Sequence, residues 1–508
     1  MNPVNQDEIN SQKRYGGILV HPTCLPGKYG IGDLGPNLYK FLDFLAKSEL
    51  RVWQILPLGP TGYGNSPYQC LSAFAGNPLL ISPDKLVHIN LLDDVKVPSF
   101  SDHKVDFGKV IPFKRELLGQ AYKNFSEMTP DSLHQHYQSF ITDQKYWLED
   151  YSLFMAIKEY KKLKSWNFWG KNFKSHNLDL IIDWREKHTD EIEYHKFVQF
   201  IFFLQWNEIC VYAHKKNVKI IGDIPIFVAY DSSDVWSHPE LFLLDNEGEL
   251  EYVAGVPPDY FSKTGQRWGN PLYRWDIMRE NGYQWWINRI RHNLSLVDYL
   301  RIDHFRGFEA NWRIKASEKT AVKGEWIQGP GIDLFLALKE ELGTLPIIAE
   351  DLGIITPEVD ELVRRTGFPG MKVLQFAFSP NQSKVLVEDR YLPHNFSYNS
   401  IVYTGTHDNE TTATWFSSAP KILKEYVLEY MNSNGDDFVG DFIRLAMSSV
   451  SQISIIPIQD FLRLGNDGRM NFPGTETGNW EWRFTLDQLT DEISKEIALF
   501  NKLYGRLG

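Results

Sequence analysis

Eight short apolar segments recur along the 508-residue chain, and each of them ends in polar or turn-forming residues. Most lack the strict alternation of apolar and polar positions that marks a strand with one solvated face. They are therefore typical of strands that are buried on both faces of a parallel sheet. We interpret these segments as strands: Gly17–His21, Arg51–Pro57, Lys219–Pro225, Tyr299–His304, Pro346–Asp351, Gly370–Phe378, Ile401–Asp408 and Ile453–Phe461.

Helical patterns occupy the intervals between these strands. In one of them Asp190 and Glu193 have the spacing of a capping box. Eight strands that alternate with helices predict a (β/α)8 barrel, also called a TIM barrel. A doubly wound open sheet is the alternative, but no G-x-G-x-x-G motif follows the first strand, which argues against its nucleotide-binding form. The expected helices are Leu38–Glu49, Gln144–Lys164, Asp190–Lys216, Gly282–Leu294, Ile332–Leu342, Pro357–Thr366, Ala419–Met431, Asp436–Ser449 and Leu486–Leu503.

Two connections between the strands are longer than a crossover requires. Residues 59–190 separate the second and third strands and contain several helical patterns, which predicts a mostly helical insertion. Residues 226–297 separate the third and fourth strands, and their middle part, Ala254–Trp275, is rich in glycine, proline and aromatic residues. We expect this part to be either a lid over an active site or a packed surface loop. The whole chain, 1–508, is then one catalytic barrel with these insertions.

The composition is that of a globular protein, since 43% of the residues are hydrophobic and 23% are charged. The net charge of −12 argues against nucleic acid or an anionic membrane as a partner, because both require a basic surface. Met1–Tyr15 is polar and no segment reaches about 18 apolar residues, so we expect a cytoplasmic protein without a membrane span. Cys24, Cys70 and Cys210 are widely spaced and predict neither disulfides nor a metal site. The sequence does not indicate the oligomeric state.

Aromatic residues are abundant: 16 Trp, 24 Tyr and 32 Phe make up 14% of the chain. Their rings fill protein cores, but they also stack on the apolar C–H faces of sugars. The aromatic content alone is therefore weak support for a carbohydrate ligand.

Charged and polar residues stand at the ends of the predicted strands. In a (β/α)8 barrel the active residues cluster at the carboxyl ends of the strands, so these side chains are expected around one opening. Such a surplus of carboxylates is what the cleavage of glycosidic bonds requires. The residues in question are His21, Asp223, Arg301, Asp303, His304, Glu350, Asp351, His407, Asp408, Gln459 and Asp460.

Three of these carboxylates form a candidate catalytic set. Arg301 and Asp303 share a strand face, so the guanidinium is expected to keep Asp303 ionised, as a nucleophile must be. Glu350 follows an apolar strand, where burial and nearby carboxylates raise a pKa and suit a general acid. Asp408 is placed to stabilise an oxocarbenium-like transition state. Taken singly, each has a structural alternative, namely an Arg–Asp pair, a salt bridge or helix cap, and an Asx turn.

The motifs around these residues resemble those of the α-amylase clan. Arg301-Ile302-Asp303-His304-Phe305-Arg306-Gly307 is similar to the nucleophile segment, Ala349-Glu350-Asp351-Leu352-Gly353 to the acid/base segment and Thr406-His407-Asp408-Asn409 to the third-carboxylate segment. Gly222-Asp223-Ile224-Pro225 fits the segment of strand three. Further stretches resemble the 4-α-glucanotransferases of glycoside hydrolase family 77, and the likeness spans about residues 15–483: Gly64–Tyr68, Gly255–Phe261, Gly265–Pro271 and Met470–Thr475.

The resemblance implies a role for each matching residue. Asp303 is expected to be the nucleophile, Glu350 the general acid/base and Asp408 the transition-state stabiliser. Arg301, His304 and His407 are expected to position these groups or to bind hydroxyls. Tyr68 is expected to stack on the donor sugar, with Asp223 and Asn471 in contact with it. Tyr260, Phe261, Gln266 and Trp268 are expected to cover the acceptor side. Phe472 stands where the family has a smaller residue. The family needs no cofactor, and no metal site is expected.

The expected activity is the transfer of a segment of a 1,4-α-D-glucan to the 4-hydroxyl of glucose or of another α-1,4-glucan, by double displacement with retention. The partners are then maltooligosaccharides, α-1,4-glucans and glucose. Two alternatives stay open. A hydrolase of the amylase type uses the same carboxylates, whereas a non-catalytic glucan-binding protein needs the aromatic residues but not the acidic trio.

Overall fold

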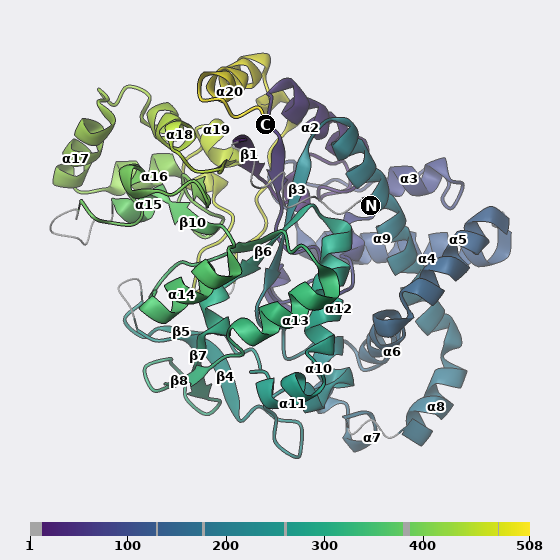
Figure 1. Cartoon of the computed structure of the whole chain (residues 1–508). Helices are drawn as coiled ribbons and strands as arrows, with labels where there is room; N and C mark the ends of the chain where they lie inside the picture. Colours follow the sequence, from purple (N-terminus) through teal and green to yellow (C-terminus); the bar gives the residue numbers. More distant parts are fainter. Residues whose placement is uncertain (1–12, 129–130, 175–177, 259–261, 379–386, 476) are drawn as a thin grey trace.

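The computed structural model describes residues 13–128, 131–174, 178–258, 262–378, 387–475 and 477–508 (Figure 1). At its centre eight parallel strands form a closed barrel in the order β1-β12-β11-β10-β9-β6-β3-β2. This confirms the predicted (β/α)8 barrel, and each of the eight predicted segments contributes one strand. Their bounds are β1 Tyr15–Leu19, β2 Val52–Gln54, β3 Lys219–Pro225, β6 Tyr299–Asp303, β9 Ile347–Ala349, β10 Gly370–Val373, β11 Ser400–Tyr403 and β12 Ile453–Pro457.

Several of the predicted strands were too long, and two of them continue as helices. The segments Gly370–Phe378 and Ile453–Phe461 each start as a strand and then turn into a short helix, α15 (Leu374–Ala377) and α19 (Ile458–Phe461). The turn falls where the parallel pairing stops, because the last paired residues are Val373 and Pro457. Beyond that point the backbone has no neighbouring strand to bond, and a local helix satisfies its N–H and C=O groups instead.

The connection between β2 and β3 is helical along most of its length. Figure 1 shows α4, α5, α6 and α8 together on one side of the barrel. The long helix α9 then leads into β3. The helices of this connection are α3 Pro83–His88, α4 Phe107–Met128, α5 Asp131–Asp143, α6 Lys145–Tyr160, α7 Lys171–Lys174, α8 Leu178–Lys187 and α9 Thr189–Lys215.

The capping box expected at Asp190 and Glu193 was wrong. Helix α9 begins at Thr189, and the N-cap residue His188 makes no capping hydrogen bond through its side chain. Glu193 lies beyond the first turn of α9 and accepts hydrogen bonds from Tyr137 and Lys196. The carboxylate therefore bonds to Tyr137 on α5 and to Lys196 one turn further along α9, and not to the helix N-terminus.

A second, antiparallel sheet lies beside the barrel, and the sequence patterns did not reveal it. Its order is β5-β4-β7-β8, from β4 (Tyr252–Val256), β5 (Gln266–Arg267), β7 (Ala310–Lys315) and β8 (Glu325–Gln328). Two strands come from the connection between β3 and β6, and the other two come from the connection between β6 and β9. Because β7 pairs with β4 and β4 pairs with β5, this sheet joins the segment after Glu309 to the strand that carries Gln266, and Figure 1 shows it beside the barrel.

The remaining helices surround the barrel. In Figure 1, α16, α17 and α18 lie on the side opposite to the helices α4–α8, and α20 lies near the C-terminus. Their bounds are α2 Pro36–Lys47, α10 Ser233–Ser237, α11 Trp275–Glu280, α12 Gln284–Leu296, α13 Ile332–Leu342, α14 Pro357–Thr366, α16 Thr412–Ser418, α17 Lys421–Met431, α18 Phe438–Ser448 and α20 Asp491–Leu503.

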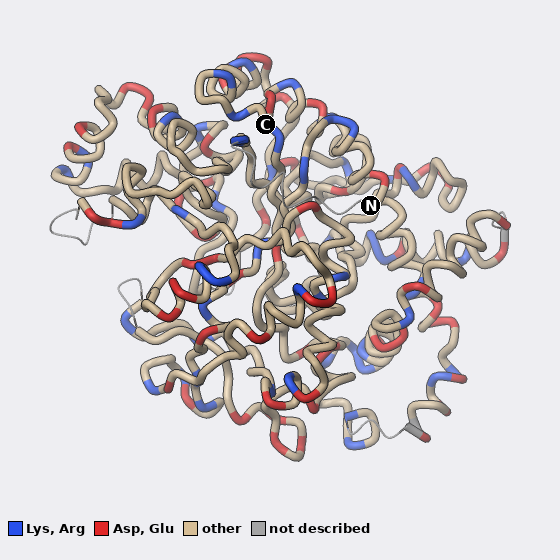
Figure 2. The backbone as a smooth tube through the Cα atoms, viewed as in Figure 1, with Lys and Arg blue, Asp and Glu red and all other residues tan. Residues whose placement is uncertain are grey.

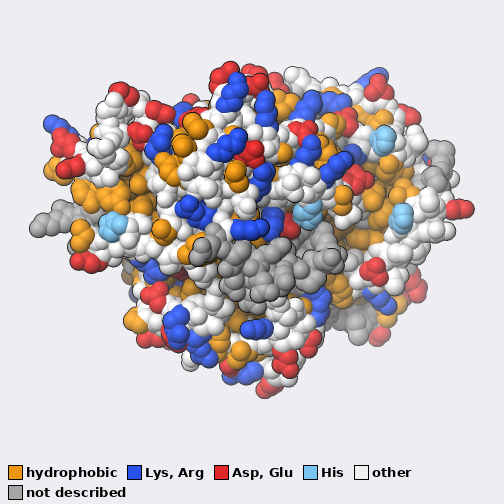
Figure 3. Space-filling model, turned by 45° about the horizontal axis from the view of Figure 1, so that its top comes forward, with side chains coloured by type: hydrophobic (Ala, Val, Ile, Leu, Met, Phe, Trp, Pro, Cys, Tyr) orange, Lys and Arg blue, Asp and Glu red, His pale blue; other side chains and the backbone are white. Residues whose placement is uncertain are grey.

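Acidic and basic residues are interspersed along the whole backbone (Figure 2). The face shown in Figure 3 carries charged side chains of both signs among hydrophobic ones. Among the described residues, no helix combines the length and the apolar character that are needed to cross a membrane. Within the same part of the chain, no group of three or more His, Cys, Asp or Glu side chains is placed to hold a metal ion.

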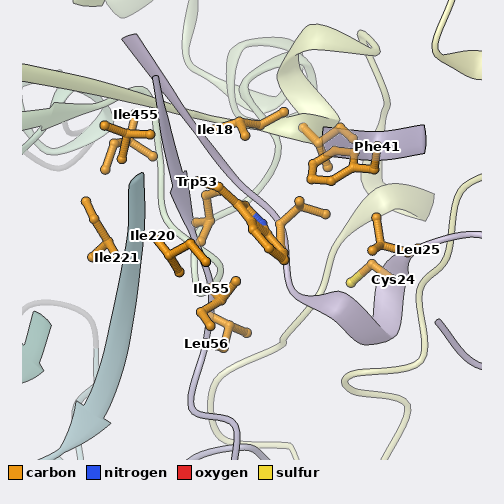
Figure 4. Close-up of a cluster of buried hydrophobic side chains, with 14 of the residues drawn as sticks. Ile18, Cys24, Leu25, Phe41, Trp53, Ile55, Leu56, Ile220, Ile221 and Ile455 are labelled. Atoms are coloured by element: carbon orange, nitrogen blue, oxygen red, sulfur yellow. The ribbon is translucent and has the colours of Figure 1, made fainter. Parts of the chain in front are cut away.

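The core that supports the barrel lies between its strands and the surrounding helices. The side chain of Trp53 on β2 is fully buried, with Ile18 and Phe41 near it (Figure 4). Its ring centroid lies 5.7 Å from that of Phe41 on α2 and 6.3 Å from that of Trp206 on α9. Its indole N–H donates to the carbonyl of Val20 over 2.8 Å, which satisfies the polar atom of this large buried ring. This packing fixes the strands, and thereby the side chains at their ends.

Candidate active site

Three acidic side chains meet in one pocket at the carboxyl ends of the barrel strands. Asp303 is the last residue of β6, and Glu350 directly follows β9. Asp408 lies on a turn beyond the end of β11. All three line a cavity of about 670 Å³. The prediction that separate strand ends bring these carboxylates together agrees with this geometry.

Arg301 joins two of the predicted site residues. Its Nη1 donates to both carboxylate oxygens of Asp223, over 2.8 and 2.6 Å, and its Nη2 donates to Oδ1 of Asp303 over 2.8 Å. The strand register dictates this arrangement, since Asp223 on β3 stands directly opposite Arg301 on β6. Arg301 and Asp223 are almost fully buried, whereas one third of the Asp303 side chain is exposed to the pocket. The guanidinium therefore holds Asp303 by one oxygen and leaves it accessible.

Glu350 lies in a different environment. Burial, together with the nearby Asp303, raises its pKa well above the ordinary value, although Arg301 and a backbone hydrogen bond oppose the shift. That bond comes from the N–H of His304, which donates to Oε2 of Glu350 over 2.7 Å. The two carboxyl groups thus differ as a nucleophile and a general acid must differ, because one is paired with a cation and the other is kept protonated to higher pH.

His304 owes its position to an unusual backbone conformation. Its φ of 52° lies in the left-handed region, which is costly for a residue with a Cβ atom. This conformation turns the chain sharply after β6 and directs the backbone N–H toward Glu350. Burial lowers the pKa of the His304 imidazole to about 4, so the ring is neutral at pH 7. Its Nε2 is buried and has no hydrogen-bond partner among the described residues.

Tyr68 is joined to the carboxylates through Asp223 and His407. Its hydroxyl donates to Oδ2 of Asp223 over 2.8 Å. Its ring stacks on that of His407, with centroids 5.0 Å apart and planes 17° apart, and it lies 6.0 Å from the ring of Trp480. The structure therefore connects Tyr68, Asp223 and His407 to the acidic trio, although these three do not line the cavity themselves.

Asp408 is held by the segment around residue 470. The side-chain amide of Asn471 donates to Oδ1 of Asp408 over 2.6 Å, and Nε2 of His407 lies 3.4 Å from the same oxygen. Arg469 donates to the backbone carbonyls of Asp408 and Asn471 over 3.0 and 2.9 Å. Since half of the Asp408 side chain is exposed and it follows no strand directly, these contacts fix its position.

Of the four residues expected on the acceptor side, the structure describes Gln266 and Trp268. Gln266 and Trp268 line the cavity, and their side chains are joined by a 3.1 Å hydrogen bond from the indole N–H. The ring of Trp268 meets that of His304 edge to face, with centroids 4.8 Å apart. Tyr260 and Phe261 lie outside the described residues.

Other carboxylates at strand ends serve structural contacts. Asp351 accepts hydrogen bonds from the backbone of Met371 and from Arg390, and it does not line the cavity. Asp460 accepts from the hydroxyls of Thr404 and Thr412. Both side chains are buried, and their hydrogen bonds stabilise the connections between strands. They therefore take no part in the chemistry of the pocket.

Several residues that line the cavity were missed by the sequence interpretation. Trp326 belongs to β8, which no hydrophobic pattern indicated, and the guanidinium of Arg306 lies over its ring at 3.9 Å. Glu410 was also missed, and it lies 3.6 Å from Arg469. The tryptophans at 312 and 326 were the available signal in the sequence, because aromatic side chains can stack on sugar rings. The further lining residues include Leu352, Ile354, Gln375, Phe376 and Trp415.

The fold and the pocket define a class: a (β/α)8 barrel protein that gathers carboxylates in one pocket beyond its strand ends, as the cleavage of glycosidic bonds requires. A family model described as 4-alpha-glucanotransferase (glycoside hydrolase family 77) matches residues 20–488. The chain is 48% identical over 503 residues to a 4-alpha-glucanotransferase of Synechocystis, covering 97% of this chain and 98% of that protein. It is 47% identical over 494 residues to one of Clostridium butyricum, covering 96% of this chain and all of that protein.

A solved structure gives the same result. The amylomaltase of Streptococcus agalactiae in complex with acarbose superposes with a TM-score of 0.92 at 39% identity, over 97% of this chain and all of that one. The chain therefore belongs to the 4-α-glucanotransferases of glycoside hydrolase family 77, as the resemblance of its motifs predicted.

Proposed function

We propose that this chain transfers a segment of an α-1,4-glucan to the 4-hydroxyl of glucose or of another α-1,4-glucan. The observation that carries the proposal is the contrast between two carboxyl groups in one pocket. Arg301 pairs with Asp303, whereas burial raises the pKa of Glu350. Membership of the glucanotransferase family favours transfer over the amylase-type hydrolysis that the motifs alone left open. The acarbose complex of the Streptococcus agalactiae amylomaltase supports a maltooligosaccharide-like ligand.

The first half of the reaction breaks the donor bond. A carboxylate oxygen of Asp303 attacks the anomeric carbon, and the bond from that carbon to the glycosidic oxygen breaks. Glu350 gives its proton to the departing oxygen, so the reducing-end part of the glucan leaves with a free 4-hydroxyl. A β-glycosyl ester then joins the donor segment to Asp303. This chemistry requires carboxyl groups about 5–5.5 Å apart.

The second half forms the new bond. Glu350, now ionised, takes the proton from the 4-hydroxyl of the acceptor as that oxygen attacks the anomeric carbon. The ester bond to Asp303 breaks and the carboxylate is regenerated. Two inversions at one carbon give net retention of the α configuration. Asp408, held by Asn471, is assigned the stabilisation of positive charge on the donor ring in both transition states.

The surrounding residues are assigned to binding. The neutral imidazole of His304, with its unpartnered Nε2, is suited to exchange a hydrogen bond with a sugar hydroxyl. Gln266 and Trp268 line the cavity beside it and are assigned to the acceptor. We also propose that Ala254–Trp275, part of the 226–297 insertion, acts as the lid, because transfer must exclude water as the competing acceptor.

Incubation with maltotriose tests this function. A glucanotransferase converts maltotriose into glucose and a series of longer maltooligosaccharides, which chromatography resolves over time. A hydrolase of the amylase type yields only glucose and maltose, and that outcome would replace the proposal. A glucan-binding protein without catalysis yields no product at all.

A further inference from the structure

An indole at the edge of the catalytic cavity has no role in the mechanism above. Trp326 lies on β8, the edge strand of the antiparallel sheet, and 39% of it is exposed. It lines the same cavity as Asp303 and Glu350. A large aromatic ring that stays exposed inside a ligand cavity forgoes the stabilisation of burial, so its surface is available to a ligand.

The contacts of Trp326 hold the ring in place. The guanidinium of Arg306 lies 3.9 Å from the ring centroid, and Arg306 is itself 4% exposed and bonded to the carbonyl of Ile354. On the neighbouring strand β7, Trp312 stands opposite Trp326 in register, with ring centroids 5.2 Å apart and planes 64° apart. Trp312 is anchored by a 2.9 Å hydrogen bond to the carbonyl of Ala321. A ring fixed in this way loses little conformational entropy when it binds a ligand.

The chemistry around the ring fits a sugar rather than a charged ligand. Apolar side chains share this cavity with Trp326, among them Val256, Pro257 and Ile354. Within the part of the chain that the structure describes, the indole N–H of Trp326 has no hydrogen-bond partner, so it can donate to a hydroxyl. An apolar ring face next to one free donor matches a pyranose, which has apolar C–H faces and a rim of hydroxyls.

The position of Trp326 assigns it to the acceptor end of a bound glucan. The family resemblance assigns Tyr68 and Asp223 to the donor side; Asp223 lies on β3, and Tyr68, in the connection after β2, donates to it. Trp326 reaches the cavity from the connection between β6 and β9. Glu350, which handles the leaving and attacking oxygens in that proposal, lies at the end of β9, beside this connection. A bound glucan that passes from the donor side across the carboxylates therefore continues toward Trp326, which lines the same cavity.

We propose that Trp326, backed by Arg306, forms a remote acceptor subsite that stacks on a glucosyl ring beyond the one that receives the new bond. The inference rests on the proposed function. It implies that Trp326 contributes to the binding of acceptors with several rings and contributes nothing to glucose, which fills only the position next to the carboxylates.

Acceptor kinetics with Trp326→Ala test the subsite. Maltoheptaose serves as the donor, and glucose or maltotriose labelled at the reducing end serves as the acceptor; only labelled products longer than the acceptor are counted. We expect the half-saturating concentration of maltotriose to rise about five- to tenfold, as for the loss of one aromatic contact, and that of glucose to stay within about twofold. Trp326→Phe keeps an aromatic ring, so it is expected to raise the half-saturating concentration of maltotriose less than Trp326→Ala does.

Control variants separate an effect on the acceptor subsite from a general loss of activity. Phe168→Ala removes an aromatic residue that is 73% exposed and does not line the cavity, so it should change neither acceptor. Trp326→Leu keeps an apolar side chain on β8 and replaces Trp326→Ala if that variant does not fold. Equal weakening of glucose and maltotriose, or unchanged kinetics for both, overturns the subsite. If the unmodified chain makes no longer products at all, the proposed function fails instead.

Discussion

Nη2 of Arg301 donates a 2.8 Å hydrogen bond to Oδ1 of Asp303, two residues along the same strand. The other terminal nitrogen of Arg301 is fully used by Asp223. One guanidinium therefore fixes the position of the proposed nucleophile and neutralises a buried carboxylate beneath it. This arrangement makes the site dependent on an arginine in a way that a lysine or a neutral side chain does not reproduce.

Replacement of Arg301 by methionine should affect stability as well as activity. Asp223 would lose the guanidinium that bonds both of its carboxylate oxygens while it stays buried, and a buried charge without its partner costs about 3–5 kcal/mol. Urea unfolding at pH 7 measures the loss. The double variant Arg301→Met/Asp223→Asn should regain part of the stability but no activity. If Arg301→Met is as stable as the unmodified chain, the ion pair contributes little to the free energy of unfolding.

Asp303→Asn should abolish transfer and leave the fold intact. The amide cannot form the glycosyl ester, so we expect a loss of about 10⁴-fold or more in kcat. One third of the side chain is exposed, and the amide can still accept the hydrogen bond from Arg301, so the melting temperature should change little. Asp333→Asn, an exposed carboxylate on α13, serves as the control and should keep full activity. Near-normal maltotriose turnover by Asp303→Asn would refute the nucleophile assignment.

Glu350→Gln should be more stable than the unmodified chain, by a margin that grows as the pH increases. A carboxyl group whose pKa is raised in the folded state has no effect on stability below its unfolded pKa; its destabilising effect grows as the pH rises above that value and is complete once the pH passes its folded pKa. The neutral amide removes this penalty. Thermal unfolding from pH 4 to pH 8 should therefore show a variant that matches the unmodified chain at low pH and exceeds it increasingly above about pH 5, while transfer from unactivated glucans is lost. An advantage that is independent of pH would contradict the shifted pKa.

Arg469 should act by positioning Asp408. It bonds the backbone of Asp408 and Asn471, lies 3.6 Å from Glu410 and packs over the ring of Phe472 at 4.6 Å. Arg469→Ala should lower kcat about tenfold to a hundredfold with a smaller change in KM, since the misplaced carboxylate acts mainly in the transition state.

Arg469→Lys should recover part of that kcat, because the lysine keeps the charge near Glu410 but loses the planar fork. Arg364→Ala, on the exposed face of α14, is the matched control. A pure KM effect of Arg469→Ala would assign the residue to substrate binding instead.

The barrel could be predicted from the sequence because its strands are buried on both faces. Segments such as Lys219–Pro225 are apolar enough to stand out, and β3 has the predicted bounds. The strands of the small sheet lack this signal. β8 (Glu325–Gln328) is only four residues long and mostly exposed, and it pairs with β7, whose other neighbour β4 comes from a different connection. Tertiary pairing, rather than local composition, makes these residues strands.

The same distinction between local sequence pattern and tertiary contact applies to the site. The side chains at the strand ends could be inferred because a parallel barrel brings those ends together, as it does for Asp303 and Glu350. The contact of Arg469 with Glu410 joins residues 59 positions apart across two loops, and no periodicity predicts it. The left-handed conformation of His304 also has no sequence signal, since histidine does not favour it as glycine does. Localisation in the cytoplasm and the roles of Tyr260 and Phe261 stay predictions.

Trapping the glycosyl intermediate tests the central claim most directly. Glu350→Gln is incubated with α-maltotriosyl fluoride, whose leaving group needs no proton, and the protein is digested and analysed by mass spectrometry. The account predicts a maltotriosyl ester on the peptide that contains Asp303, and no such adduct in Asp303→Asn/Glu350→Gln. An adduct on Asp408, or none on Asp303 although fluoride is released, would contradict it.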